Sequence, residues 1–181
     1  KIVLAVSAGI AAYKAVELLR LLMKEGAEVH VVMSANAGQF VTPLTFKALS
    51  GKTVYHKTYG SKSSGDMEHI RVAENSDLML VVPASASTIG KIANGLADDA
   101  LSNLYLAFKG SVIFAPAMNE GMWQNLAVQD NIAKLKSRGV EFVDPEQGEL
   151  ACGATGPGRL ADLDTIMGRV ENHFNQIQDL Q

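Results

Sequence analysis

The first 33 residues, KIVLAVSAGIAAYKAVELLRLLMKEGAEVHVVM, decide the fold class. Residues 1–7 are a short run rich in Val, Ile and Leu that ends in a Ser-Ala-Gly turn, which is the profile of a buried parallel strand. Residues 10–25 then place apolar side chains at helical spacing and stop at Gly26, which suits a helix C-cap. Residues 28–33 form a second apolar run. This strand–helix–strand unit predicts a right-handed crossover between parallel strands.

The same alternation of strands and helices continues along the chain. Apolar runs predict three further strands at residues 77–82, 111–115 and 140–143. Helical patterns cover residues 36–49 (as two short helices, because of Pro43), 87–94, 98–108, 120–137 and 164–174. We therefore expect one α/β domain over residues 1–181, a doubly wound parallel sheet that is Rossmann-like or flavodoxin-like. Such a sheet binds its ligand at the carboxyl ends of the strands.

Two segments lack a regular pattern. Residues 60–65 (GSKSSG) predict a polar, flexible loop. Residues 146–159 are rich in glycine and show no periodicity, and we interpret this stretch, to about residue 160, as a flap over the ligand site.

Composition and charge argue against nucleic acid and membranes as partners. Of the 181 residues, 48% are hydrophobic and 19% charged, which is a normal globular balance. The net charge of -3 gives no electrostatic reason to expect nucleic acid, and no apolar run approaches the roughly 18 residues of a membrane span. The lone Cys152 excludes an internal disulfide and fits a reducing compartment. We expect a cytoplasmic protein with a small-molecule ligand, no metal, and no nucleic-acid or membrane partner.

Turns at three strand ends favour a mononucleotide ligand. The turn from Ser7 to Ile10 precedes a helix, where free N–H groups and the helix dipole favour an anion, although an ordinary turn would look the same. The full G-x-G-x-x-G pattern is absent, and the second strand ends in a neutral MSAN run without the acidic residue that NAD-binding folds place there. Residues 83–88 (PASAST) add hydroxyl groups that could simply be helix N-caps. Together these turns favour FMN over NAD.

Five segments carry a family resemblance. They are SAGIAAYK (7–14), His69 within MEHIRVAE, PASASTIGKIANGLADD (83–99), PAMNEGMW (116–123) and ACGATGPGRL (151–160). In order and spacing, over nearly the whole chain, they resemble the homo-oligomeric flavin-containing cysteine decarboxylases. PAMNEGMW is the most specific segment. The ACG segment indicates the coenzyme A branch, because the lantibiotic-peptide decarboxylases generally lack that cysteine.

The resemblance implies a function and a set of roles. It implies a carboxy-lyase that uses FMN to convert 4'-phosphopantothenoylcysteine to 4'-phosphopantetheine through transient oxidation of the thiol. His69 is then the acid/base and Cys152 the proton donor, while Asn119, Ala117 and Met118 bind substrate. The cofactor residues are Ser7, Gly9, Ile10, Ala11, Ser34, Asn36, Phe40, Ser85, Ala86, Ser87, Thr88 and Ala117. A homotrimer, or a dodecamer of trimers, with FMN at a subunit boundary is implied as well.

Each of these residues also has an ordinary structural explanation. A lone His is usually structural or solvated, Asn119 suits a helix N-cap, and a free Cys is commonly a small buried hydrophobe. The sequence also departs from the family pattern at two positions. Ala154 stands where relatives usually have Asp or Glu, and Ser87 where many have Asn.

Three alternatives remain open on sequence alone. A peptidyl-cysteine decarboxylase is disfavoured by the presence of Cys152, because that chemistry stops at the enethiol. A non-catalytic flavoprotein regulatory subunit is disfavoured by the lack of an acidic tail. A flavin prenyltransferase is disfavoured by PAMNEGMW.

Overall fold

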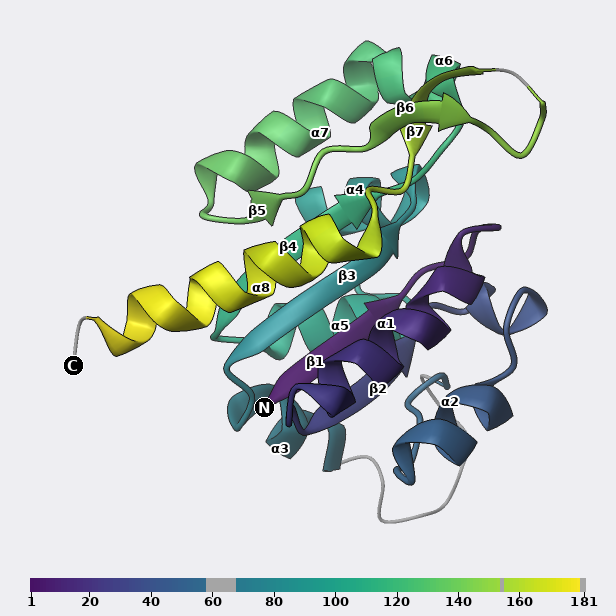
Figure 1. Cartoon of the computed structure of the whole chain (residues 1–181). Helices are drawn as coiled ribbons and strands as arrows, with labels where there is room; N and C mark the ends of the chain where they lie inside the picture. The colour runs from purple at the N-terminus through teal and green to yellow at the C-terminus, as the bar shows by residue number, and fades with distance from the viewer. Residues whose placement is uncertain (58–67, 154, 180–181) are drawn as a thin grey trace.

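The computed structural model describes residues 1–57, 68–153 and 155–179, with Glu68, His69 and Gln178 described by their backbone only. Five parallel strands form the central sheet in the order β2-β1-β3-β4-β5 (Figure 1). Their bounds are β1 Ile2–Val6, β2 Val29–Met33, β3 Leu78–Ala84, β4 Ser111–Pro116 and β5 Glu141–Phe142. This is the flavodoxin-like order of a doubly wound sheet, so the predicted fold class is confirmed.

Helices cover both faces of the sheet (Figure 1). One face packs against α1 (Ala12–Lys24), α2 (Pro43–Ser50) and α8 (Leu163–Gln178). The other packs against α3 (Glu68–Glu74), α4 (Ala86–Ala93), α5 (Ala100–Ala107) and α7 (Leu126–Ser137). The short elements η1 (Ala37–Gln39) and α6 (Glu120–Gln124) follow strands β2 and β4.

The two cores explain the uninterrupted apolar runs. Along β1, Leu4 and Val6 belong to the core under α1 and α8, whereas Val3 and Ala5 belong to the core under α4 and α5. All five residues of β1 and all seven of β3 are buried. Because a central parallel strand is covered on both faces, every position must be apolar, and the strand is easily recognised from sequence.

Several predicted boundaries were wrong, among them that of the last helix, which runs from Leu163 to Gln178 and not over residues 164–174. The helix expected over residues 120–137 is two helices, because Asn125 has extended backbone and its Oδ1 accepts the N–H of Ala127 at 2.9 Å as the N-cap of α7. Strand β3 continues two residues further than expected, through Pro83 and Ala84. The predicted fifth strand is shorter than expected. The two short helices predicted over residues 36–49 are confirmed as η1 and α2.

Residues 146–159 form an antiparallel hairpin, not an irregular segment. Its strands are β6 (Glu146–Glu149) and β7 (Thr155–Arg159), paired only with each other. Glycine and proline in β7 hide the period-2 pattern that normally identifies a strand. The predicted loop at residues 60–65 and the position of Ala154 lie outside the described residues. Among the described helices, none is long and apolar enough to cross a membrane.

Candidate functional site

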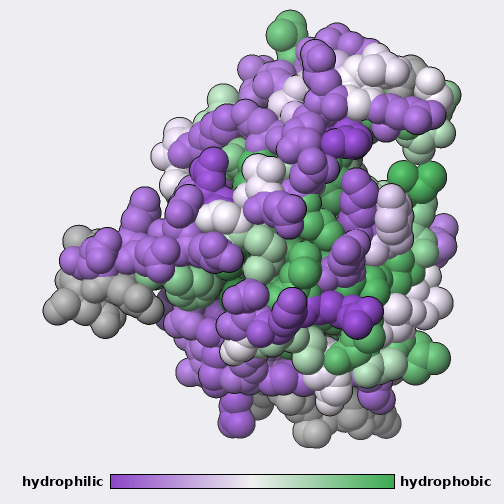
Figure 2. All heavy atoms as spheres, in the orientation of Figure 1, coloured by the Kyte–Doolittle hydropathy of each residue, from purple (hydrophilic) through white to green (hydrophobic). Residues whose placement is uncertain are grey.

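A cavity of about 950 Å³ opens at the carboxyl ends of the strands, between the start of α1 and the hairpin. Figure 2 shows hydrophobic side chains along this side of the molecule, between the hairpin and the helices below it. Most of the predicted cofactor residues line the cavity, namely Gly9, Ile10, Ala11, Ser34, Asn36, Ser85, Ala86, Ser87, Thr88 and Ala117. All three predicted substrate residues, Ala117, Met118 and Asn119, line it too, and so does Cys152. Side chains far apart in the sequence therefore share one site.

Ser7 supports the site from behind its wall. It is fully buried, and its hydroxyl donates to the carbonyl of Pro83 at 2.5 Å and accepts the N–H of Ser85 at 2.8 Å. It therefore fixes the turn after β1 to the start of α4. We had expected a cofactor contact here, and Ser7 is not among the described lining residues.

The turn after β1 offers unused hydrogen-bond donors. The N–H of Ala8 donates to Ser34 Oγ at 3.0 Å, but the N–H groups of Gly9 and Ile10 find no acceptor within the described chain. A Cβ added at Gly9 would meet nothing within 4 Å, so the protein leaves this turn open. Such unpaired donors at a helix start fit a phosphate group.

The start of α4 faces the same cavity. Ser85 is its N-cap, and Ser85 Oγ accepts the N–H of Thr88 at 3.2 Å. The ordinary N-cap explanation therefore holds for Ser85, while its cofactor contact stays a prediction. Ser87, one of the two departures from the family pattern, lies beside it in the lining. Two helix N-termini, those of α1 and α4, thus converge on one cavity, and both favour negative charge.

Asn119 presents its amide to the cavity. It is the N-cap of α6, as predicted, and its Oδ1 accepts the N–H of Gly121 at 2.8 Å. The Nδ2 group makes no hydrogen bond within the described chain, so two N–H donors remain for a ligand. Behind Asn119, the N–H of Met118 donates to the carbonyl of Gly158 at 2.9 Å, which ties this segment to the hairpin.

Cys152 lies at the tip of the hairpin. Its side chain is exposed and lines the cavity with its neighbours Glu149, Leu150 and Ala151. The turn is closed by the N–H of Gly153, which donates to the carbonyl of Leu150 at 2.8 Å. Cys152 is therefore not a buried core residue, and the hairpin is placed over the site as a flap would be.

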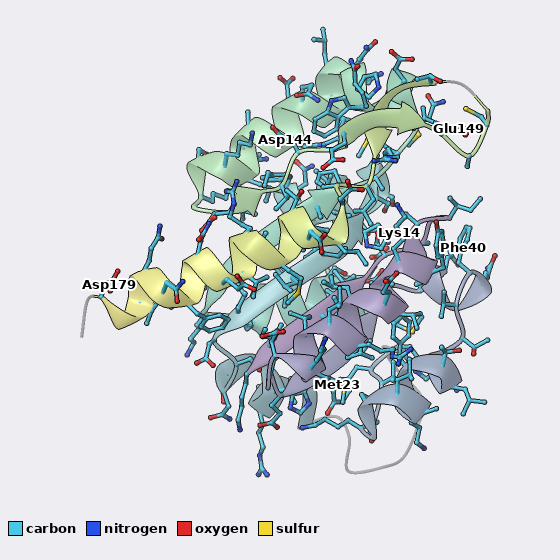
Figure 3. The ribbon with its side chains drawn as sticks, viewed as in Figure 1. Lys14, Met23, Phe40, Asp144, Glu149 and Asp179 are labelled. Carbon is cyan, nitrogen blue, oxygen red and sulfur yellow. The ribbon has the colours of Figure 1, made fainter. Side chains whose placement is uncertain are left out.

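Besides Ser7, two predicted residues are not among the described lining residues. Phe40 is 51% exposed and is not among the described lining residues; Figure 3 labels it at the outer side of the fold. The backbone of His69 lies in the first turn of α3, where we had expected the residue to precede a helix. The His69 side chain lies outside what the structure describes. No described lining residue comes from α3.

The cavity also contains charged residues that the sequence argument missed. Lys91 Nζ lies 2.8 Å from Asp98 Oδ1 and 3.7 Å from Asp99 Oδ2. Hydrogen bonding to Asp98 raises the pKa of Lys91, and the same contact lowers the pKa of Asp98. Asp99 is buried, caps α5 and accepts the N–H of Ala35 at 3.3 Å. Lys91 lies in the last turn of α4, and its sequence position carries no signal that would have identified it.

The base of the hairpin is fixed by ionic contacts. Glu146 accepts the backbone N–H of Asp162 and a hydrogen bond from Arg159, both at 3.2 Å. The N–H of Asp162, and then Arg159, lower the pKa of Glu146. The stabilisation is therefore present while Glu146 is ionised and is lost as pH falls through its lowered pKa.

We expect Glu146→Gln to lower the melting temperature at neutral pH by a few degrees at most, since the contacts are partly exposed. The difference from the unsubstituted protein should shrink to zero as the solution is acidified below the pKa of Glu146. Melting curves across the acid range measure this, with Glu171→Gln, an exposed carboxylate of α8, as the control. A difference that stays constant to low pH would contradict the prediction.

Comparison with known proteins agrees with this geometry. The family model described as Flavoprotein matches residues 1–175. The coenzyme A biosynthesis bifunctional protein CoaBC of Haemophilus influenzae is 41% identical over 180 residues, 99% of this chain and 45% of that protein. CoaBC of Bacillus subtilis is 45% identical over 173 residues, 96% of this chain and 43% of that protein. The chain thus spans less than half the length of these curated relatives.

Solved structures show the same architecture. A cysteine-to-serine mutant of PPC decarboxylase complexed with pantothenoylaminoethenethiol superposes with a TM-score of 0.86 at 29% identity, covering 96% of this chain and 97% of that one. The FMN binding protein AtHal3 gives 0.82 at 28% identity, covering 97% and 96%. The family match extends from β1 into α8 and so includes every segment that lines the cavity. The chain belongs to the flavoprotein family.

Proposed function

We propose that the chain binds FMN and decarboxylates 4'-phosphopantothenoylcysteine to 4'-phosphopantetheine. One observation carries the proposal: a single cavity joins the unpaired N–H groups of Gly9 and Ile10, the Nδ2 group of Asn119, which is unpaired within the described chain, and the thiol of Cys152. The named relatives support it, since CoaBC is a coenzyme A biosynthesis protein and the superposed structure is a PPC decarboxylase.

The chain's own residues suit FMN. The N–H groups of Gly9 and Ile10, with the hydroxyl of Ser87 and the start of α4, would hold its phosphate. Ala86, Ala117 and Pro83 would form the small-residue wall against its ring. When bound, FMN supplies reversible oxidation of the thiol-bearing carbon, so that CO2 can leave without forming an unstabilised carbanion.

Asn119 and Cys152 would act on the substrate. The Nδ2 donors of Asn119 bind the carboxylate; because the amide is neutral, it holds that group without stabilising its charge strongly. Cys152 then gives a proton to the enethiolate that remains after CO2 has left. We propose that the hairpin closes during this step, because a closed flap keeps water from the reactive product.

His69 would be the acid/base from a neighbouring subunit. Imidazole titrates near neutral pH, which suits this role, but no described lining residue comes from α3. We propose, as the family resemblance implies, a homotrimer or a dodecamer of trimers, in which α3 of one subunit approaches the cavity of the next. The lone cysteine suits a cytoplasmic location.

The test is an absorbance spectrum of the purified protein, followed by assays of CO2 release. Flavin bands and CO2 release from 4'-phosphopantothenoylcysteine are expected. A peptide ending in cysteine is the comparison substrate, and turnover of the peptide alone would assign the chain to the peptidyl branch. A flavin-bound protein that turns over neither substrate would support a non-catalytic regulatory subunit.

Asn119→Asp separates substrate binding from folding. Aspartate caps a helix as well as asparagine, so α6 should form normally and the protein should retain its flavin. The new carboxylate cannot donate to the substrate carboxylate and repels it, so kcat/KM should fall by about 10- to 100-fold or more. Steady-state kinetics measure this. A colourless variant would mean that Asn119 belongs to the flavin site.

A further inference from the structure

Three cationic side chains line the cavity: Lys14, Lys91 and Arg159. Two of them are already neutralised by the protein. Lys91 pairs with Asp98 and Asp99, and Arg159 NH2 lies 3.2 Å from both Glu146 and Asp162. Lys14 makes no ion pair or side-chain hydrogen bond within the described chain. It is the one cationic group of the described lining whose charge is free for a ligand.

The position of Lys14 is set by α1. It is the third residue of that helix and is half-buried, so its stem is held against the protein while its ammonium group reaches the cavity. Figure 3 labels Lys14 between the start of α1 and the hairpin, whereas Phe40 lies at the outer side. Lys14 thus lines the cavity from the α1 side, whereas Asn119 and Cys152 line it from α6 and the hairpin.

We propose that Lys14 binds the phosphate monoester of the substrate and thereby makes the site selective for a phosphorylated small molecule. This inference rests on the proposed function. A lysine ammonium serves as a point charge for phosphate, and partial removal from water strengthens the attraction. The cavity, about 950 Å³, is at the upper end of the roughly 300–1,000 Å³ typical of ligand sites, which leaves room for a substrate beside a cofactor.

The cofactor phosphate has other donors. The unpaired N–H groups of Gly9 and Ile10 and the start of α4 supply a site that needs no lysine. The substrate phosphate is at the opposite end of its molecule from the cysteine carboxylate, which Asn119 takes. Of the remaining cavity residues that the structure describes, only Lys14 offers an uncompensated positive charge for that phosphate.

Glu149 is the alternative partner for Lys14. It lines the cavity from the hairpin, and its carboxylate makes no ion pair within the described chain (Figure 3). A pair between Lys14 and Glu149 would hold the hairpin closed over any substrate, phosphorylated or not. The two roles therefore predict different responses to removal of the substrate phosphate.

The experiment compares 4'-phosphopantothenoylcysteine with pantothenoylcysteine on the FMN-bound enzyme. The unsubstituted protein should prefer the phosphorylated substrate, and Lys14→Gln should lower its kcat/KM by about 10- to 100-fold while changing that of pantothenoylcysteine by less than about threefold. Lys14→Arg should restore most of the preference. Lys24→Gln, which removes an exposed charge from the last residue of the same helix, should behave as the unsubstituted protein.

Two measurements without turnover complete the test. Calorimetry should show that Lys14→Gln weakens binding of 4'-phosphopantetheine but not of pantetheine, and the flavin content should stay unchanged. Loss of flavin would assign Lys14 to the cofactor phosphate and overturn the inference. Equal loss on both substrates, reproduced by Glu149→Gln, would assign it to hairpin closure and overturn it too.

The activity of the unsubstituted enzyme on the two substrates distinguishes a wrong role for Lys14 from a wrong proposed function. An unsubstituted enzyme that turns over both substrates equally well would refute the role of Lys14 and leave the decarboxylase function intact. An unsubstituted enzyme that turns over neither would refute the proposed function itself.

Discussion

Cys152→Ser is expected to leave the first release of CO2 intact and to stop the reaction at the enethiolate, so that the enzyme does not begin a second turnover. The Cys152 side chain is exposed at the hairpin tip and lines the cavity, so it can reach the product after CO2 has left. A serine hydroxyl has nearly the same size but is a far weaker acid, so proton transfer to the enethiolate fails. Positioned general acids contribute about 100- to 10,000-fold, so multiple turnover should fall by at least about 100-fold.

Two measurements separate the half-reactions. One equivalent of CO2 per bound flavin should appear in a single-turnover assay, and mass spectrometry should find a product two hydrogens short of 4'-phosphopantetheine. Cys152→Ala, which has no proton to give, should behave in the same way. Full multiple turnover in either variant would remove Cys152 from the mechanism and leave the hairpin only a structural part of the site.

The positions of the central strands could be predicted from the sequence because these strands are covered by the core on both faces. In β1 and β3 every side chain is buried, so the sequence contains no polar residue that would obscure the pattern. The same reasoning located the turns that line the cavity, because the carboxyl ends of parallel strands share one edge. The buried strands and the turns after them are each set by a few consecutive residues, so a single sequence is enough to predict them.

Other features depend on contacts between distant segments. Lys14 and Lys91 have ordinary helical positions in the sequence, and only folding reveals which of them is neutralised by a neighbour. Ser7 was expected to touch a cofactor, but its partners, Pro83 and Ser85, are 76 and 78 residues away. The glycines of β7 hid a strand because they serve close approaches, of Gly156 to the Glu120 side chain and of Gly158 to the Met118 backbone, which no periodicity reports.

Gly158 makes the second of these close approaches, and Gly158→Ala is expected to be strongly destabilising. An added Cβ would overlap the carbonyl oxygen of Met118, and the backbone φ of +128° is one that other residues rarely adopt. Overlap with backbone and the unfavourable φ each cost about 1–3 kcal/mol, so the free energy of unfolding should fall by roughly 2–5 kcal/mol. The hairpin would otherwise have to move away from Met118 and break its hydrogen bond to the Gly158 carbonyl.

Functional loss should exceed what the lower stability explains, because that hydrogen bond also ties the segment of Asn119 to the hairpin that carries Cys152. Thermal unfolding should show a decrease of roughly 5–20 °C, and the folded fraction should bind 4'-phosphopantetheine more weakly while retaining FMN. Gly168→Ala is the matched control: it lies inside α8, an added Cβ there meets nothing within 4 Å, and alanine should stabilise the helix by about 0.5–1 kcal/mol. If Gly158→Ala were as stable and as active as the control, the hairpin could not be held against the Met118 backbone, and the shared placement of Asn119 and Cys152 in one cavity would need another cause.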